Sequence, residues 1–93
     1  MGEILYFYLS SCPHCSKADR IIRSVVERYP EFKQVKIRKI EESLKPDIAD
    51  KYDYYYVPCF FVNGKKIFEG PASVEKVYDA FREALKQTDS ENN

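Results

Sequence analysis

Residues 4–15 read ILYFYLSSCPHC, and this stretch is the most informative part of the sequence for the fold. It begins with an unbroken apolar run, which is typical of a strand covered on both faces. It ends with two cysteines, Cys12 and Cys15, at the point where a long amphipathic helix pattern begins. Ser10-Ser11 can cap that helix, and Pro13 is tolerated in the first turn because its missing N–H needs no partner there.

The rest of the chain alternates between strand signals and helix signals. Strands are expected over residues 3–9, 34–40, 59–62 and 65–69. Helices are expected from residue 13 to before Pro30, over 43–53, and after Ser73, which can cap the last of them. Asn63-Gly64 predicts a tight hairpin between the last two strands. The order βαβαββα predicts an α/β fold with a four-stranded mixed sheet flanked by helices.

Length and charge narrow the classes of function. Ninety-three residues make one small domain, which we assign to residues 1–86, with a polar C-terminal tail over 87–93. Fifteen basic and fifteen acidic residues cancel, so we expect neither nucleic acid nor a membrane as a partner. The chain shows no basic leader or long apolar segment, which favours a cytoplasmic protein. We expect it to be a monomer.

The Cys-Pro-His-Cys stretch carries the predicted chemistry. Two thiols three residues apart in the first turn of a helix can close a disulfide, and the unpaired N–H groups there stabilise a thiolate. Cys12 is the predicted nucleophile, and Cys15, one turn along, is the predicted resolving thiol. His14 adds a donor and, when protonated, a positive charge. Pro13 limits the backbone freedom between the two sulfurs.

These residues resemble the thioredoxin-fold superfamily over roughly residues 3–86. The resemblance rests on the element order, the dithiol after the first strand, Val57-Pro58 before the third strand, Asn63-Gly64 and Gly70. The compact start and the short spacing after Pro58 are most similar to a glutaredoxin. The resemblance implies a cis-proline at 58 that faces the dithiol, an exposed first sulfur and a sheltered second one. Tyr6 stands where thioredoxins usually bury an aspartate.

The resemblance also implies how a substrate would bind. The backbone of Val57, ahead of Pro58, would pair with the substrate as an added strand. Tyr56 belongs to a dense aromatic patch, Tyr52 and Tyr54–Tyr56. Most of these rings should pack in the core or at its edge, and one or two could line the substrate groove.

The predicted function is a small thiol–disulfide oxidoreductase that reduces or exchanges protein disulfides. It binds no cofactor and no metal, and glutathione or an NADPH-dependent reductase supplies its electrons. Two alternatives stay open. The Pro-His dipeptide resembles that of strongly oxidising members, which suggests a disulfide oxidant or isomerase. A metal-binding protein of the same fold could use Cys12, Cys15 and Cys59. Cys59 by itself is more simply explained as a small apolar residue that opens a buried strand.

Overall fold

The computed structural model describes the backbone of residues 2–91 and the side chains of residues 2–86. The elements are β1 (Glu3–Tyr8), α1 (Pro13–Arg28), a 3-10 helix (Pro30–Gln34), β2 (Lys36–Glu41), α2 (Pro46–Ala49), β3 (Cys59–Val62), β4 (Lys65–Glu69) and α3 (Val74–Glu91). The predicted βαβαββα order is confirmed. The backbone of α3 continues through Glu91, into the segment predicted as a polar tail. Residues 92–93 of that tail lie outside the described residues.

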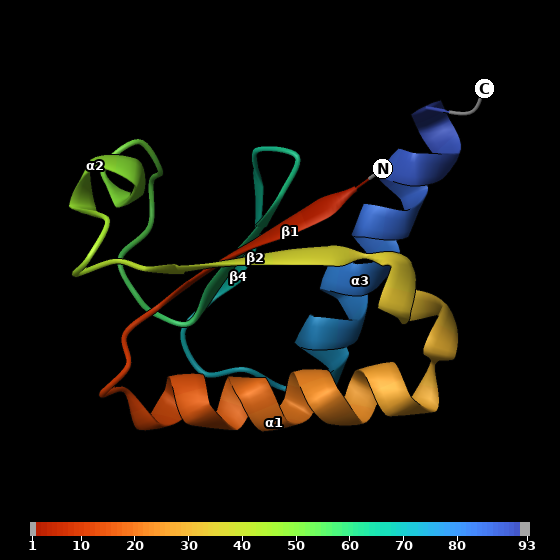
Figure 1. Ribbon diagram of the computed structural model, residues 1–93, viewed down its shortest axis with the longest axis horizontal. Helices are drawn as coiled ribbons and strands as arrows, with labels where there is room; N and C mark the ends of the chain where they lie inside the picture. The colour runs from red at the N-terminus through yellow and green to blue at the C-terminus, as the bar shows by residue number, and fades with distance from the viewer. Residues whose placement is uncertain (1, 92–93) are drawn as a thin grey trace.

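The four strands form one mixed sheet in the order β2-β1-β3-β4. β1 pairs in parallel with β2, whereas β3 is antiparallel to both β1 and β4. β4 therefore runs in the same direction as β1 and β2 (Figure 1). Because the carboxyl ends of β1, β2 and β4 meet at one edge of the sheet, the segments that follow these strands start close together.

The helices cover both faces of the sheet, as predicted (Figure 1). α1 and α3 pack on one face over a core that includes Tyr6, Phe60 and Phe81. α2 lies over the other face, where Phe7 and Phe61 form part of a smaller cluster. Neighbouring residues of a strand point to opposite faces, and so Tyr6 and Phe7 serve different cores. No helix in the described part of the chain is both long and apolar enough to cross a bilayer.

The hairpin between β3 and β4 has the predicted bounds. Asn63 and Gly64 both have positive φ, at 51° and 80°, as the two central residues of a type I′ turn require. The predicted cap of α3 is also present, because the Ser73 hydroxyl accepts a hydrogen bond from the Lys76 amide at 3.2 Å. Val74, which the helical spacing assigns to the buried face of α3, is instead 57% exposed.

Three predicted elements are shorter than expected, and the first of them, β1, ends one residue early at Tyr8. β2 starts at Lys36 because the residues after Pro30 form a 3-10 helix that buries Phe32. The Phe32 ring stacks on Phe81 of α3, with ring centroids 4.9 Å apart. α2 covers four residues rather than 43–53.

Candidate active site

The dithiol lies at the start of α1, shortly after the end of β1. Pro13 is the first helical residue, and Cys12 directly precedes it with an extended backbone. The Cys12 carbonyl accepts hydrogen bonds from the amides of Cys15 and Ser16, at 3.1 and 3.2 Å. The predicted cap at Ser10-Ser11 is therefore wrong by one residue, because Cys12 itself occupies the capping position. Cys12 thus stands at the amino-terminal end of α1, which is the positive end of the helix dipole. The first turn of α1 contains no acidic residue.

The two thiols differ in their access to solvent. Cys12 is half-buried, whereas Cys15 is 2% exposed. Both are free cysteines, and they lie close together, at 3.6 Å. Burial raises the pKa of the Cys15 thiol to about 11, and nearby Cys12 and Asp19 contribute to the increase. Cys15 therefore keeps its proton at neutral pH, and Cys12 is the sulfur that a substrate can reach.

The loop before β3 approaches Cys12 from the other side. The Val57–Pro58 peptide bond is cis, as the family resemblance implies. The Cys12 thiol donates to the Val57 carbonyl at a long distance of 4.0 Å. Val57 is half-buried, Pro58 is buried, and Tyr56 is 67% exposed. The fold therefore brings Val57-Pro58 beside the Cys12 sulfur and leaves Tyr56, the residue before Val57, at the surface.

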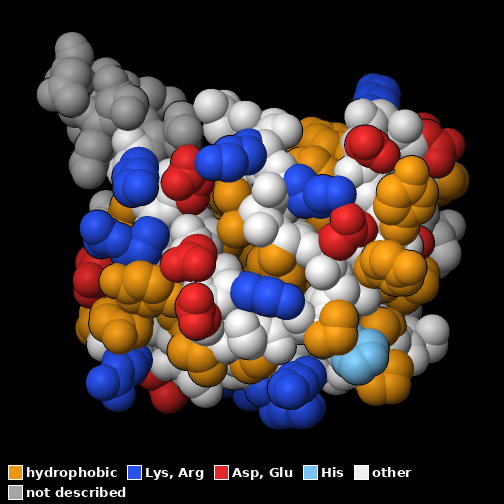
Figure 2. Space-filling model, turned by 180° about the vertical axis from the view of Figure 1, so that it is seen from behind, with side chains coloured by type: hydrophobic (Ala, Val, Ile, Leu, Met, Phe, Trp, Pro, Cys, Tyr) orange, Lys and Arg blue, Asp and Glu red, His pale blue; other side chains and the backbone are white. Residues whose placement is uncertain are grey.

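Pro13 and His14 form the outer surface of the first turn of α1. Both side chains are exposed. Figure 2 shows the histidine, in pale blue, at the surface with hydrophobic side chains around it. The imidazole is thus free to meet a docking substrate, and the motif is presented on a mainly apolar part of this face.

The Tyr6 hydroxyl is hydrogen-bonded to the first turn of α1. Tyr6 is 0% exposed, and its hydroxyl donates to the Cys15 carbonyl at 3.0 Å. Burial raises the pKa of Tyr6, and the Asp19 carboxylate adds to this effect. Lys39 pairs with Asp19 at 3.2 Å and lies over the Tyr6 ring at 5.3 Å from its centroid. A tyrosine thus holds the backbone of the buried cysteine of the pair.

Two glutamates that the sequence analysis does not single out hold the loops on either side of the dithiol. Glu41, at the end of β2, accepts the Ser10 hydroxyl at 2.7 Å and the Ser43 hydroxyl at 2.7 Å. Hydrogen bonds from these two serines lower the pKa of Glu41 to about 2. Glu69, at the end of β4, accepts the amides of Tyr55 and Tyr56. One feature could have pointed to these two glutamates. Both are the last residues of strands that run parallel to β1, so both end at the edge of the sheet where the dithiol lies.

Cys59 does not join the dithiol. It is 0% exposed and belongs to the cluster with Phe7, Ile40 and Phe61, on the face of the sheet opposite α1. Burial raises its pKa to about 12. Within residues 2–86, no three His, Cys, Asp or Glu side chains lie together in a way that could hold a metal ion. The simple interpretation of Cys59 as a core residue is confirmed, and the three-cysteine metal site is not formed.

The dense tyrosine patch divides into two kinds of residue. The rings of Tyr52 and Tyr54 lie 5.0 and 4.9 Å from the Phe7 ring, centroid to centroid, and are part of the smaller core. Tyr55 and Tyr56 are 82% and 67% exposed. The first pair confirms the predicted packing role, and the second pair is available to a binding partner.

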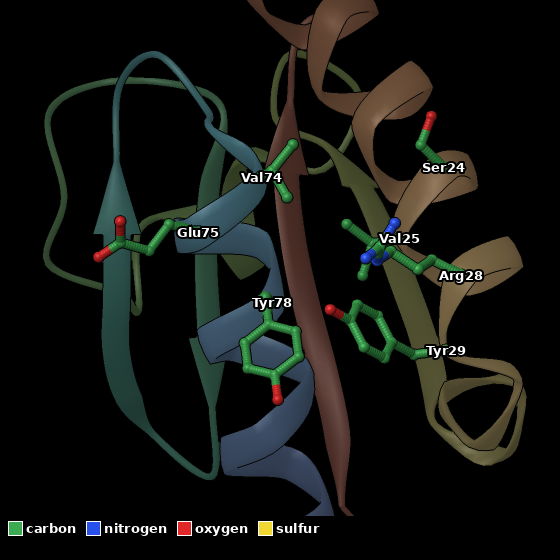
Figure 3. Close-up of a pocket in the computed structure, with 7 residues that line it drawn as sticks. All are labelled: Ser24, Val25, Arg28, Tyr29, Val74, Glu75 and Tyr78. Carbon is green, nitrogen blue, oxygen red and sulfur yellow. The ribbon is translucent and has the colours of Figure 1, made fainter.

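An apolar groove of about 580 Å³ lies elsewhere, between α1 and the start of α3 (Figure 3). It is lined by Ser24, Val25, Arg28, Tyr29, Val74, Glu75 and Tyr78. These residues belong to the second half of α1, to Tyr29 just after it and to the first turns of α3, so neither cysteine of the motif lines this groove. The reactive chemistry lies at the opposite end of α1.

Comparison with known proteins agrees with this geometry. The family model described as thioredoxin domain matches residues 4–82. A thioredoxin of Methanocaldococcus jannaschii is 29% identical over 83 residues, which covers 89% of this chain and 95% of that protein. The thioredoxin of Fasciola hepatica superposes with a TM-score of 0.69 at 21% identity, over 89% of this chain and 80% of that one.

A third comparison extends the likeness to mitochondrial thioredoxin 3 of Saccharomyces cerevisiae, with a TM-score of 0.68 at 20% identity, over 88% of this chain and 77% of that one. At such identities the structural likenesses show the fold alone. The expected likeness to glutaredoxins in particular stays a prediction, since the relatives named here are thioredoxins. The family match over most of the chain, together with the paired thiols at the start of α1, leads to one conclusion: the chain belongs to the thioredoxin domain family and is a thiol–disulfide oxidoreductase.

Proposed function

We propose that the protein reduces disulfides of other proteins, with Cys12 as the nucleophile and Cys15 as the resolving thiol. The observation that carries this proposal is the asymmetry of the pair. One thiol is half-buried at the start of α1, and the other is buried 3.6 Å away and holds its proton. A substrate disulfide can reach only the first, and an intermediate formed on the first is within reach of the second.

The reaction proceeds in two exchanges. The Cys12 thiolate attacks one sulfur of the substrate disulfide, a Cys12–substrate disulfide forms, and the other substrate sulfur leaves as a thiolate that takes up a proton. Cys15 then loses its proton and attacks the Cys12 sulfur. The Cys12–Cys15 disulfide forms, and the second substrate sulfur leaves and is protonated. The substrate gains two electrons and two protons, and the protein dithiol is oxidised.

The neighbouring residues take supporting roles in this proposal. The amino-terminal dipoles of α1 stabilise the Cys12 thiolate, and a protonated His14 adds to that effect. Pro13 keeps the two sulfurs at closing distance. The backbone of Val57, ahead of Pro58, pairs with an extended substrate segment as an added strand, and Tyr56 contacts the residue beside the substrate cysteine.

The electron donor and the cellular location are part of the same proposal. The relatives named above favour an NADPH-dependent reductase as the donor, and glutathione is the alternative. A cytoplasmic protein fits a dithiol that must be kept reduced. Measuring the reduction potential of the Cys12–Cys15 pair distinguishes this function from that of an oxidant, which the Pro-His dipeptide suggests. A potential of about −270 mV supports a reductase, and one of about −120 mV supports an oxidant.

Insulin reduction with dithiothreitol as the electron source tests the chemistry. The unmodified protein should accelerate the reaction, and Cys12→Ser should abolish the acceleration. If Cys12→Ser reduces insulin as fast as the unmodified protein, Cys12 is not the nucleophile and the proposal is wrong.

A further inference from the structure

The segment between α2 and β3 has no regular secondary structure of its own, yet it carries the residues proposed to meet the substrate. Residues 53–58 are neither helix nor strand. Their backbone N–H groups therefore lack the partners that a helix or sheet would provide, and need others. This segment leads directly into Val57, whose carbonyl lies 4.0 Å from the Cys12 sulfur.

One side chain supplies partners for two of these N–H groups. The Glu69 carboxylate accepts the Tyr55 amide at 2.7 Å and the Tyr56 amide at 3.0 Å, both on Oε2. Its other oxygen accepts the Lys66 ammonium at 2.6 Å, and Lys66 also donates to the Asp53 carbonyl at 3.4 Å. Side chains of β4 therefore hold the segment at Asp53, Tyr55 and Tyr56. The Gly70 amide, just after β4, adds a backbone hydrogen bond to the Pro58 carbonyl at 2.9 Å.

The hydrogen bonds to Glu69 do not depend on pH near neutrality. The Lys66 ammonium and the two amides lower the pKa of Glu69 to about 2, so the carboxylate stays charged near neutrality. Hydrogen bonds to a charged acceptor are among the stronger ones in proteins. The backbone amides of Tyr55 and Tyr56 point to Glu69, and these two residues are 82% and 67% exposed.

We propose that Glu69 is a positioning residue for substrate recognition, which holds residues 55–57 in the conformation that receives an extended protein segment beside Cys12. The inference rests on the proposed function and adds a residue to it. Glu69 does not touch the sulfurs. Its loss should weaken the binding of a protein disulfide while leaving the chemistry at Cys12 unchanged.

The test compares a large substrate with a small one. In the full chain, Glu69→Gln keeps the shape of the side chain and removes its charge. Its KM for insulin should rise about tenfold with kcat nearly unchanged, the loss expected when charged hydrogen bonds that order a binding loop are weakened. Reduction of 5,5′-dithiobis(2-nitrobenzoate), which is too small to need the loop, should stay within about twofold.

Two controls separate positioning from a general loss of stability. Glu27→Gln removes one negative charge from an exposed position on α1 and should change neither reaction. Lys66→Met leaves the two backbone amides on Glu69 and should raise the KM for insulin less than Glu69→Gln does. Amide hydrogen exchange should show Tyr55 and Tyr56 protected in the unmodified protein and exposed in Glu69→Gln.

The possible results distinguish a failure of the inference about Glu69 from a failure of the proposed function. An unchanged KM for insulin in Glu69→Gln overturns the inference, and so does an equal loss with both disulfides. If the unmodified protein reduces neither disulfide, the proposed function fails instead. Protection of the Tyr55 and Tyr56 amides then still reports whether Glu69 holds the loop.

Discussion

Cys15 and Cys59 are both buried thiols, but they lie on opposite faces of the sheet and only one belongs to a reactive pair. Burial raises the pKa of the first to about 11 and of the second to about 12. Cys15 lies 3.6 Å from a second thiol at the start of a helix. Cys59 has Phe7, Ile40 and Phe61 as neighbours. A buried thiol with a raised pKa is therefore not by itself a redox site; a second sulfur within reach makes it one.

The largest expected difference between the two cysteines is in catalysis. Cys15→Ser should lower insulin reduction at least about a hundredfold and accumulate a disulfide between Cys12 and the substrate, because the resolving thiol is gone. Cys59→Ser should retain activity within about threefold, since Cys59 belongs to the cluster on the face of the sheet opposite α1. Activity assays and non-reducing gels measure both effects. Trapping by Cys59→Ser rather than Cys15→Ser would mean that the resolving thiol is misassigned.

Alkylation should distinguish the same thiols at a single pH. At pH 7, iodoacetamide should modify Cys12 first and leave Cys15 and Cys59 almost unmodified. A thiol with a pKa of about 11 is ionised to only about one part in ten thousand at that pH. Peptide mass spectrometry after timed quenching gives the three rates. The comparison breaks down if Cys59 reacts as fast as Cys12, because the thiol on the α2 face would then be accessible.

The Cys59 thiol should also make stability depend on pH in the alkaline range. Its pKa is raised from 9.0 to about 12, so its contribution is complete below pH 9 and is lost as the pH rises toward 12. Between these values Cys59→Ala should lose less unfolding free energy than the unmodified protein. The difference is at most a few kcal/mol, at about 1.4 kcal/mol per pKa unit. Urea unfolding at each pH measures it, and parallel curves for the two proteins would contradict the prediction.

The smallest expected effect concerns the tyrosines on the two faces. Tyr6 donates to the Cys15 carbonyl at 3.0 Å, and Tyr54 donates to Glu42 at 2.8 Å. Replacing either by phenylalanine should lower the free energy of unfolding by about 1 kcal/mol, the usual net contribution of one hydrogen bond. Only Tyr6→Phe should also change the rate at which Cys15 resolves the intermediate. Equal resolution rates in both variants would show that the Tyr6 hydroxyl does not position Cys15.

The parts of the fold that depend on neighbours in sequence could be predicted best. The β3–β4 hairpin has its expected bounds because Asn63 and Gly64 select the turn and the flanking strands pair with each other. α1 ends before Pro30, because proline has no backbone N–H to donate and its ring clashes with the carbonyl one turn earlier. The dithiol was equally accessible to sequence analysis, since its chemistry is contained in one tetrapeptide.

The features that could not be predicted depend on distant contacts. Ser10 does not cap α1, because its hydroxyl bonds to Glu41, 31 residues along the chain. The 3-10 helix before β2 buries Phe32, which stacks on Phe81 of α3. β2 therefore starts later than the local sequence predicts. The role of Glu69 becomes visible only when the direction of β4 relative to β1 is known. Cys59 follows Pro58 in the sequence, but the alternation of side chains along β3 turns it to the face of the sheet opposite α1.

The placement of the two strand-end glutamates has a consequence for engineering. Glu41 holds the serine loop before the dithiol from β2, and Glu69 holds the tyrosine loop from β4, so the two loops are attached to opposite outer strands of the sheet. A library that varies the side chains at 55 and 56 but keeps Glu69 leaves the backbone anchors of both loops in place. New partner preferences could thus be selected on this scaffold without rebuilding its reactive centre.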